Sequence, residues 1–456
     1  MASSTLSAPA APPREEIAKI IARDAYTTSR QDESASPHTH KGYLIRMADD
    51  EKRSWTHVLS ELGVNQTHSP QVFGRTVRMA AVDLSHEEAR TISRRGNVAS
   101  IEKNYIRRAA VMPSKSKARV MARGWRHDIR RRQADSMVVQ NTATWGLERI
   151  STNATIDLGD RNAEDTFFKY KFDRLSGSGV DVYVLDSGIN INHVDFAGRA
   201  KMVFTAFDDN GEDKAGHGTH TAGTVGSLTY GVAKNVNIMG VKVLNDKGEG
   251  EDAGISKGID AVIDMHEERK AKLGFMGSVI TMSIGEGGTS ITLGDIVRRA
   301  SQAGIHIVVS AGNEGGDACG ADPARLSTQM PVITVGATDI QDQRAKFSNW
   351  GKCVDIHAPG VDVVSTWNEG NRSVKSEEGT SMAAPHVAGV IATELAKNGQ
   401  FKTDPEGMKK WIMANALDGV IKGGDKVMGG AKYLLNTGIG GGSSNTTMKA
   451  YYMKSF

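Results

Sequence analysis

The stretch "VDVYVLDSGIN", residues 180–190, indicates the fold of this 456-residue chain. It begins as a short, mostly apolar run that ends at Asp186, and Ser187 and Gly188 follow as turn residues. Runs of this kind are typical of parallel strands that are buried on both faces of a sheet. Such sheets carry their binding and catalytic groups at the carboxyl ends of the strands, which is where Asp186 stands.

Four further runs of the same kind alternate with helical stretches along the chain. They span residues 236–244, 278–285, 305–313 and 331–338. This alternation predicts an α/β fold with a doubly wound parallel sheet, which we assign to residues 141–440.

The residues before this region predict a second, smaller domain. Expected strands at 41–47, 72–84 and 98–106 alternate with two amphipathic helical stretches. Because strand and helix alternate within a short length, we expect a small α+β domain over residues 41–108.

The remaining segments show no sustained hydrophobic period. Residues 1–40 are rich in Ala, Ser and Pro, and we expect them to be disordered. Residues 109–140 form a basic linker, and residues 441–456 are assigned as a C-terminal tail. No signal peptide is visible in the first residues, and no run of about 18 apolar residues predicts a membrane span, so we expect no membrane partner.

Charge is distributed unevenly along the chain. Residues 1–141 carry 24 Lys and Arg against 15 Asp and Glu, whereas residues 142–456 carry 32 against 38. A basic tract can indicate nucleic-acid binding, but this one lacks the interleaved aromatic residues that stack on bases, so we expect no nucleic acid. The alternative is that the basic N-terminal part associates with the acidic remainder.

Two further motifs carry polar groups that complement Asp186. "AGHGTHTAGTVG" contains His217 between glycines, and "GTSMAAPHVAG" contains Ser381 at the start of an expected helix. A serine hydroxyl needs a base to become a nucleophile, and an imidazole needs a carboxylate to fix its tautomer. Asp, His and Ser occur in the chain order that the subtilisin arrangement requires.

A fourth candidate follows another expected strand. In "VVSAGNEGG", Asn313 comes just after the strand and two small residues, where its amide could donate to an oxyanion. Taken alone, each candidate could be a turn residue or a helix cap. The occurrence of all four in order favours a catalytic set.

These four motifs resemble the signature regions of subtilisin-like serine proteases. The segments "HVDFAGRA", "WGLERIS" and "FSNWGKCVDIHAPGVDVVSTW" are similar to the fungal proteinase K and cerevisin branch. The resemblance covers roughly residues 140–436, and residues 41–108 resemble the inhibitory propeptide of the family, which is an intramolecular chaperone.

The resemblance implies a serine endopeptidase that is made as a self-processing zymogen. It implies that Asp186 orients His217, that His217 deprotonates Ser381, and that Asn313 and the Ser381 amide hold the oxyanion. The partners would be protein and peptide substrates and the chain's own propeptide as an intramolecular inhibitor. We expect a monomer that needs no cofactor for chemistry, is extracellular or vacuolar, and cuts itself near residues 139–144.

Two segments resemble the edges of the substrate cleft. They are Ser283, Ile284 and Gly285 on one side, and Gly248, Glu249 and Gly250 on the other. Glu251, Asp252 and Glu286 make the surroundings acidic, which predicts that the outer subsites of a broadly specific enzyme tolerate basic residues. The alternative is a solvated loop.

The family pattern also implies two structural features. The Val332 carbonyl and the Asp355 carboxylate would contribute to a calcium site, because calcium prefers oxygen ligands. Cys319 and Cys353 would form a disulfide in an exported chain. Two rival interpretations stay open, namely a non-catalytic binding protein on the same fold and a narrow processing protease of the kexin type.

Overall fold

The computed structural model describes residues 40–75, 77–112, 136–285, 288–423 and 432–439. The predicted disorder before residue 40, most of the basic linker and the C-terminal tail lie outside these ranges, and so does Glu286. No described helix is long and apolar enough to cross a membrane.

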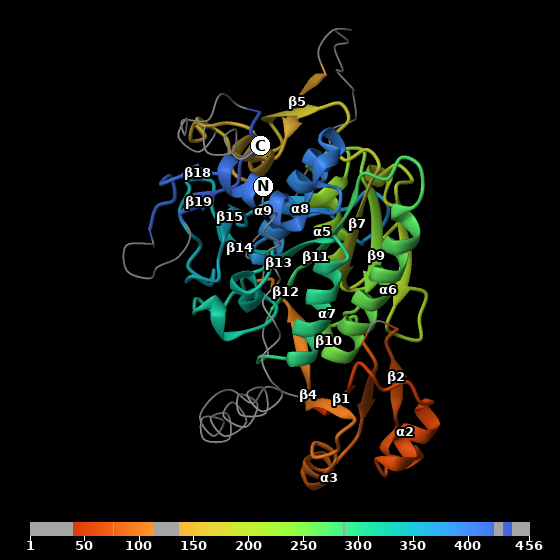
Figure 1. The fold of residues 1–456 in the computed structure, drawn as a ribbon. Helices are drawn as coiled ribbons and strands as arrows, with labels where there is room; N and C mark the ends of the chain where they lie inside the picture. The colour runs from red at the N-terminus through yellow and green to blue at the C-terminus, as the bar shows by residue number, and fades with distance from the viewer. Residues whose placement is uncertain (1–39, 76, 113–135, 286–287, 424–431, 440–456) are drawn as a thin grey trace, which may run out of the picture. The chain divides into compact units, whose positions relative to one another are not determined.

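The main sheet has nine strands among the described residues, in the order β18-β19-β15-β14-β13-β11-β7-β9-β8 (Figure 1). From β8 to β19 every neighbouring pair is parallel, and only the short β18 runs antiparallel. The strands are β7 (Val180–Asp186), β8 (Ala200–Thr205), β9 (Asn237–Lys242), β11 (Gly277–Met282), β13 (His306–Ser310), β14 (Val332–Thr338), β15 (Ile356–Pro359), β18 (Leu417–Asp418) and β19 (Tyr433–Leu434).

Alternate residues of each central strand belong to two separate cores. Val182 and Val184 of β7 pack in the core that includes α5 (His217–Gly226) and α8 (Thr380–Lys397). Tyr183 and Leu185 pack in the core that includes α6 (Asp252–Lys270) and α7 (Ile291–Gln302). Helices therefore cover both faces, which explains the nearly continuous apolar runs and confirms the doubly wound sheet.

A second sheet contains the N-terminal strands. Its order is β10-β4-β1-β3-β2, with β12 also paired to β4. The N-terminal elements are β1 (His40–Met47), α2 (Trp55–Glu61), β2 (Gln71–Phe73), β3 (Met79–Val82), α3 (His86–Ile92) and β4 (Val98–Ala109). Apolar residues of the strands and of both helices form a small core of their own, as an α+β unit requires.

The remaining elements surround these two sheets. They are β5 (Met137–Ala143), α4 (Trp145–Ile150), β6 (Phe168–Asp173), β16 (Val363–Thr366), β17 (Val374–Glu377), α9 (Pro405–Asn415) and the 3₁₀ turns Gln66–His68, Val194–Phe196, Ala318–Gly320, Ala324–Thr328 and Gly399–Phe401.

Strand β4 connects the N-terminal unit with the larger unit, which contains the main sheet. It extends to Ala109, beyond the predicted end at residue 106, because its last residues pair with two strands that follow much later in the chain. Ile106 to Arg108 pair antiparallel with β10 (Glu249–Glu251), and Arg108 and Ala109 pair antiparallel with β12 (Ile284–Gly285).

Polar side chains of β4 cap two helices of the larger unit. Glu102 accepts from the backbone N–H groups of Ile291 and Thr292 at 2.8 and 2.7 Å, at the start of α7. Asn104 Oδ1 accepts from Ala253 N at 3.0 Å, at the start of α6. The N-terminal unit therefore satisfies backbone donors that a helix cannot satisfy internally.

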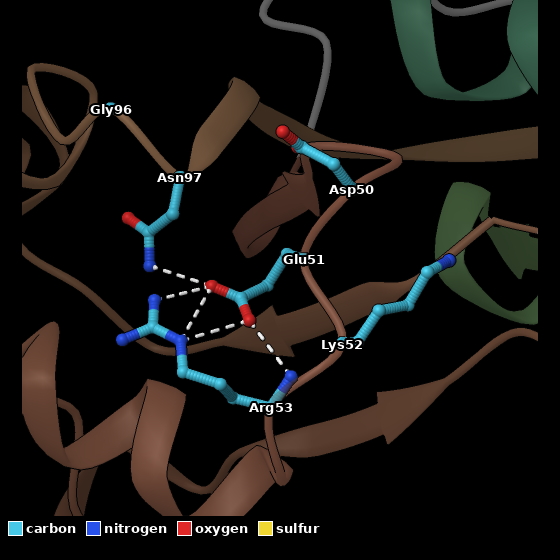
Figure 2. Close-up of a pocket in the computed structure, with 6 residues that line it drawn as sticks. All are labelled: Asp50, Glu51, Lys52, Arg53, Gly96 and Asn97. Atoms are coloured by element: carbon cyan, nitrogen blue, oxygen red, sulfur yellow. Dashed lines mark hydrogen bonds and ion pairs between the residues drawn. The ribbon is translucent and has the colours of Figure 1, made fainter.

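The N-terminal unit also carries a pocket that is lined mainly by charged and polar residues, drawn in Figure 2. Its centre is the Glu51 carboxylate, which is paired with Arg53 and accepts from Asn97 Nδ2 at 3.4 Å. Hydrogen bonds from Arg53 lower the pKa of Glu51 to about 2. Because its carboxylate is already paired, this pocket serves the local structure of the unit.

Candidate active site

Asp186 and His217 form a buried hydrogen-bonded pair at the carboxyl end of β7. His217 Nδ1 lies 2.7 Å from Asp186 Oδ1, and the same oxygen accepts from Ser187 N at 2.7 Å. Thr221 Oγ1 donates to the second carboxylate oxygen at 3.2 Å. A carboxylate held in this way keeps the proton on Nδ1 and leaves Nε2 as the basic nitrogen.

His217 begins α5, and the glycine before it is required by space. Gly216 has a φ of +89°, and a Cβ there would lie 2.3 Å from the Trp367 ring. The ring of His217 is almost fully buried, and Nε2 has no hydrogen-bond partner among the described residues. The basic nitrogen is thus unoccupied.

The pKa of His217 is raised above its ordinary value. Burial by itself disfavours the charged ring, but the adjacent Asp186 carboxylate outweighs it, with smaller contributions from Asp213 and Glu377. The imidazolium form is therefore stabilised, as a base that gains a proton during the reaction requires.

Ser381 is the second residue of α8, and its side chain is fully buried. Its Oγ donates to Ser283 O at 3.1 Å, and the structure shows no hydrogen bond from Oγ to His217 Nε2. The hydroxyl must therefore turn from the Ser283 carbonyl toward the imidazole before it can transfer its proton.

Asn313 lies three residues beyond β13, next to the start of α8. Its Oδ1 accepts from Thr380 N at 2.9 Å and from Thr380 Oγ1 at 2.8 Å. Since both bonds fix the oxygen, the amide orientation is set, and Nδ2 is buried without a partner among the described residues. Thr380 is a positioning residue that the sequence did not reveal.

Residues 109 and 110 of the chain bond to the two segments that were predicted to form the edges of the substrate cleft, beside Ser381. Ala109 N donates to Gly248 O at 2.9 Å, and Ala110 N donates to Ser283 O at 3.1 Å. Further along, Met112 N donates to Glu378 O at 2.8 Å. All six predicted cleft-edge residues lie in the two segments that flank the end of β4 and the residues after it.

The carbonyl of Ala110 lies at one of the two predicted oxyanion donors, the Ser381 N–H, whereas Asn313 Nδ2 makes no hydrogen bond to it. Ser381 N donates to Ala110 O at 3.2 Å. A Cβ on Gly379 would lie 2.5 Å from that oxygen, 3.1 Å from Val111 Cα and 3.2 Å from Asn313 Nδ2. Only glycine leaves room for a peptide bond to approach this closely.

Two histidines of the same motifs have structural roles. His220 Nε2 lies 3.0 Å from Val363 O, and burial lowers its pKa to about 3. His386 Nδ1 lies 2.8 Å from Met382 O, and burial lowers its pKa to about 4. Both rings are therefore neutral members of the core.

The two predicted calcium ligands lie together, but a lysine lies between them. Lys409 Nζ donates to Val332 O at 2.7 Å and to Ser327 O at 3.0 Å, and it lies 2.8 Å from Asp355 Oδ1. These residues do not fit calcium, because the ammonium group already takes the oxygen atoms. The Lys409 ammonium group thus lies where the calcium ion was predicted. Lys409 belongs to α9, and the sequence around it did not indicate this role.

Cys319 and Cys353 are joined by a disulfide, with their Cα atoms 5.3 Å apart and a sequence separation of 34 positions. The bond ties the 3₁₀ turn that follows Asn313 to the loop before β15. Closing a loop of this length restricts the unfolded chain and so stabilises the native state.

Comparison with known proteins identifies the larger unit. A model of the subtilase family matches residues 177–440. Alkaline protease 2 of Aspergillus fumigatus is 42% identical over 323 residues, which cover 68% of this chain and 62% of that protein. Cerevisin of Saccharomyces cerevisiae is 43% identical over 294 residues, which cover 62% of this chain and 45% of that protein.

A solved structure agrees with this result. The crystal structure of a cold adapted subtilisin-like serine proteinase is 39% identical and covers 65% of this chain and 98% of that chain, with a TM-score of 0.56. The chain thus spans less than two thirds of the length of Alkaline protease 2 and of Cerevisin, but almost the whole of this solved structure.

The raised pKa of His217 predicts the pH dependence of activity. The protonated ring cannot accept the Ser381 proton, so activity is lost as pH falls through this pKa. The acidic limb of kcat/KM should therefore have its midpoint above the ordinary histidine value of 6.5. Asp186→Asn should lower kcat by roughly 10⁴-fold and shift the limb to lower pH.

The control for this profile is Asp208→Asn, a change in an exposed loop, which should leave both the limb and kcat unchanged. A wild-type midpoint at or below 6.5 would contradict the raised pKa.

The position of Lys409 predicts how stability responds to calcium. Lys409→Met should lower the free energy of unfolding by about 2 kcal/mol, because Asp355 loses its cation in a nearly buried setting. Lys410→Met, in the same helix but with an exposed side chain, should change it by less than about 0.5 kcal/mol. Thermal unfolding measures both stability changes, and the melting temperature of the wild type should not rise when calcium is added. A wild-type melting temperature that rises with calcium, together with an unchanged stability of Lys409→Met, would show that Lys409 does not take the place of a calcium ion.

Proposed function

The chain belongs to the subtilase family, and we propose that it is a serine endopeptidase that is made as a self-processing zymogen. The observation that carries the proposal is the hydrogen bond from Ser381 N to the carbonyl oxygen of Ala110, the residue that directly follows β4. A peptide bond of the chain itself is therefore held at the nucleophile in the manner of a substrate.

The reaction follows from the geometry of the four residues. His217 Nε2 takes the proton of Ser381 Oγ, and the oxygen attacks the carbonyl carbon of the substrate. The negative charge that develops on the carbonyl oxygen is stabilised by Ser381 N and Asn313 Nδ2. The tetrahedral intermediate then collapses, the C–N bond breaks, and His217 gives its proton to the departing amine.

A water molecule completes the cycle. It enters where the amine has left, loses a proton to His217 and attacks the ester carbonyl of the acyl-enzyme. The second tetrahedral intermediate expels Ser381 Oγ, which takes the proton back, and the free carboxylate leaves. Asp186 stabilises the imidazolium in both halves of the reaction.

We assign the processed bond to Ala110–Val111. The register of Ala109, Ala110 and Met112 against both sides of the cleft supports this bond. The sequence-based expectation of a cut near residues 139–144 has less support, because residues 137–143 belong to β5, which pairs with β6. The cut proposed here would leave the basic tract on the enzyme, where a kexin-like protease could remove it at Arg130–Arg132, a site outside the described residues.

The N-terminal unit acts as the inhibitor of the enzyme until it is released. Its strand β4 fills the cleft and caps α6 and α7, and its net positive charge is complementary to the negative charge of the larger unit.

The disulfide between Cys319 and Cys353 is consistent with an oxidising compartment, which supports a location outside the cell or in a vacuole. The substrates are proteins and peptides, and the enzyme acts as a monomer.

The processing step is tested by the size and the N-terminus of the products. The wild-type chain should yield a fragment that begins at Val111, whereas Ser381→Ala should remain at full length. Val111→Pro should block this cut, because proline changes the backbone after the scissile bond, and Val139→Pro should leave it intact. Asn313→Ala should slow the cut by roughly 10²–10³-fold.

A fluorophosphonate probe should label the wild type at Ser381 and should not label Ser381→Ala. Self-cleavage by Ser381→Ala, or an unlabelled wild type, would reject the proposed mechanism and favour the non-catalytic alternative.

A further inference from the structure

We propose that the cleft contains an arginine-selective subsite, built around Asp252, for the fourth residue before the bond that is cut. The inference rests on the proposed endopeptidase function and deepens it by naming a substrate class. In the chain itself, Arg107 of β4 fills this subsite, and Ala110 is the residue whose carbonyl lies at Ser381.

Among the described residues, four hydrogen bonds hold the guanidinium of Arg107. Its Nε and Nη2 donate to Asp252 Oδ1 and Oδ2 at 2.7 and 3.0 Å, a bidentate pair. Its Nη1 donates to Gly288 O at 2.9 Å and to Asp322 O at 2.8 Å. Both charged side chains are fully buried, with exposed fractions of 0%.

The acceptors all belong to the larger unit, so the subsite remains when β4 leaves. Asp252 is the first residue of α6, where the partial positive charge of the helix end favours a carboxylate. The side chain of Asp322 is occupied by Ser290 N at 2.8 Å and by Arg325, which leaves its backbone carbonyl for the guanidinium. The Asp322 carbonyl is therefore held in place by contacts other than those to Arg107, and Asp252 is held by its position in α6.

The arrangement of acceptors suits arginine better than lysine or an apolar residue. A planar guanidinium can satisfy one carboxylate in two bonds and two carbonyls on its other side at the same time. A lysine ammonium has three donors at one point and cannot reproduce this fork. An apolar residue would leave the Asp252 carboxylate buried without a cation, which is costly.

The neighbouring residue shows the contrast between a selective and a tolerant position. Arg108 pairs with Glu249 at 3.1 Å, but their side chains are 50% and 29% exposed. An ion pair this accessible to water contributes little to the free energy of binding. We therefore expect strong selection for arginine at the fourth residue before the cleaved bond and only a weak preference for it at the third. The predicted tolerance of basic residues thus becomes a selectivity for arginine at the fourth residue.

The test uses the processed wild-type enzyme and peptides with the sequence of residues 105–112, "YIRRAAVM". Replacing the residue equivalent to Arg107 by leucine should lower kcat/KM roughly 100-fold, and replacing it by lysine should lower it at least about tenfold. The matched control replaces the residue equivalent to Arg108 by leucine and should cost less than about fivefold.

An Asp252→Asn enzyme should lose this discrimination. Its ratio of kcat/KM for the arginine and leucine peptides should fall below about five, whereas Glu249→Gln should keep the wild-type ratio. If Asp252→Asn fails to fold, the peptide series with the wild type still decides the question.

Three outcomes distinguish the two proposals. Casein hydrolysis with equal kcat/KM for the arginine and leucine peptides would overturn the subsite alone, and would mean that Arg107 serves only to hold the N-terminal unit. A protein that neither hydrolyses casein nor reacts with a fluorophosphonate would overturn the endopeptidase function and the subsite with it. If Asp252→Asn still hydrolyses the arginine peptide much better than the leucine peptide, residues other than Asp252 determine the selectivity.

Discussion

The antiparallel pairing of β4 with both edges of the cleft is the interaction on which the other features depend. Unpaired strand edges bind any extended chain that reaches them, and a protease needs such edges for its substrates. Here the chain's own strand pairs with β10 and β12, and this pairing fixes which residue lies at Ser381. The register then determines that Ala110 presents its carbonyl and that Arg107 lies over Asp252.

The same strand also completes the larger unit from outside. Glu102 and Asn104 satisfy backbone donors at the starts of α7 and α6, and Arg107 neutralises Asp252 at the first residue of α6. When β4 leaves, water and substrate must replace these partners. Inhibition and substrate selection thus use the same contacts, which is why the bound segment indicates what the enzyme accepts.

Local patterns in the sequence were sufficient to predict the main sheet and the polar residues that follow its strands. The apolar run that ends at Asp186 predicts both a buried parallel strand and its reactive end, and Asn313 follows another strand in the same way. The register of β4 was not predictable, because residues 106–109 pair with strands more than 130 residues away, and no local pattern encodes a pairing of that range. Lys409 escaped prediction for the same reason, since its partners lie in distant segments.

Hydrogen exchange of the full-length Ser381→Ala chain tests whether β4 and the residues after it pair with β10 and β12 in solution, because exchange reports whether backbone amides are hydrogen-bonded. We expect the amides of Ala109, Ala110 and Met112 to exchange as slowly as those of β11, since each donates to a backbone carbonyl of the larger unit. Exchange of these three amides at the rate of an unstructured peptide, with β11 still protected, would show that β4 does not occupy the cleft.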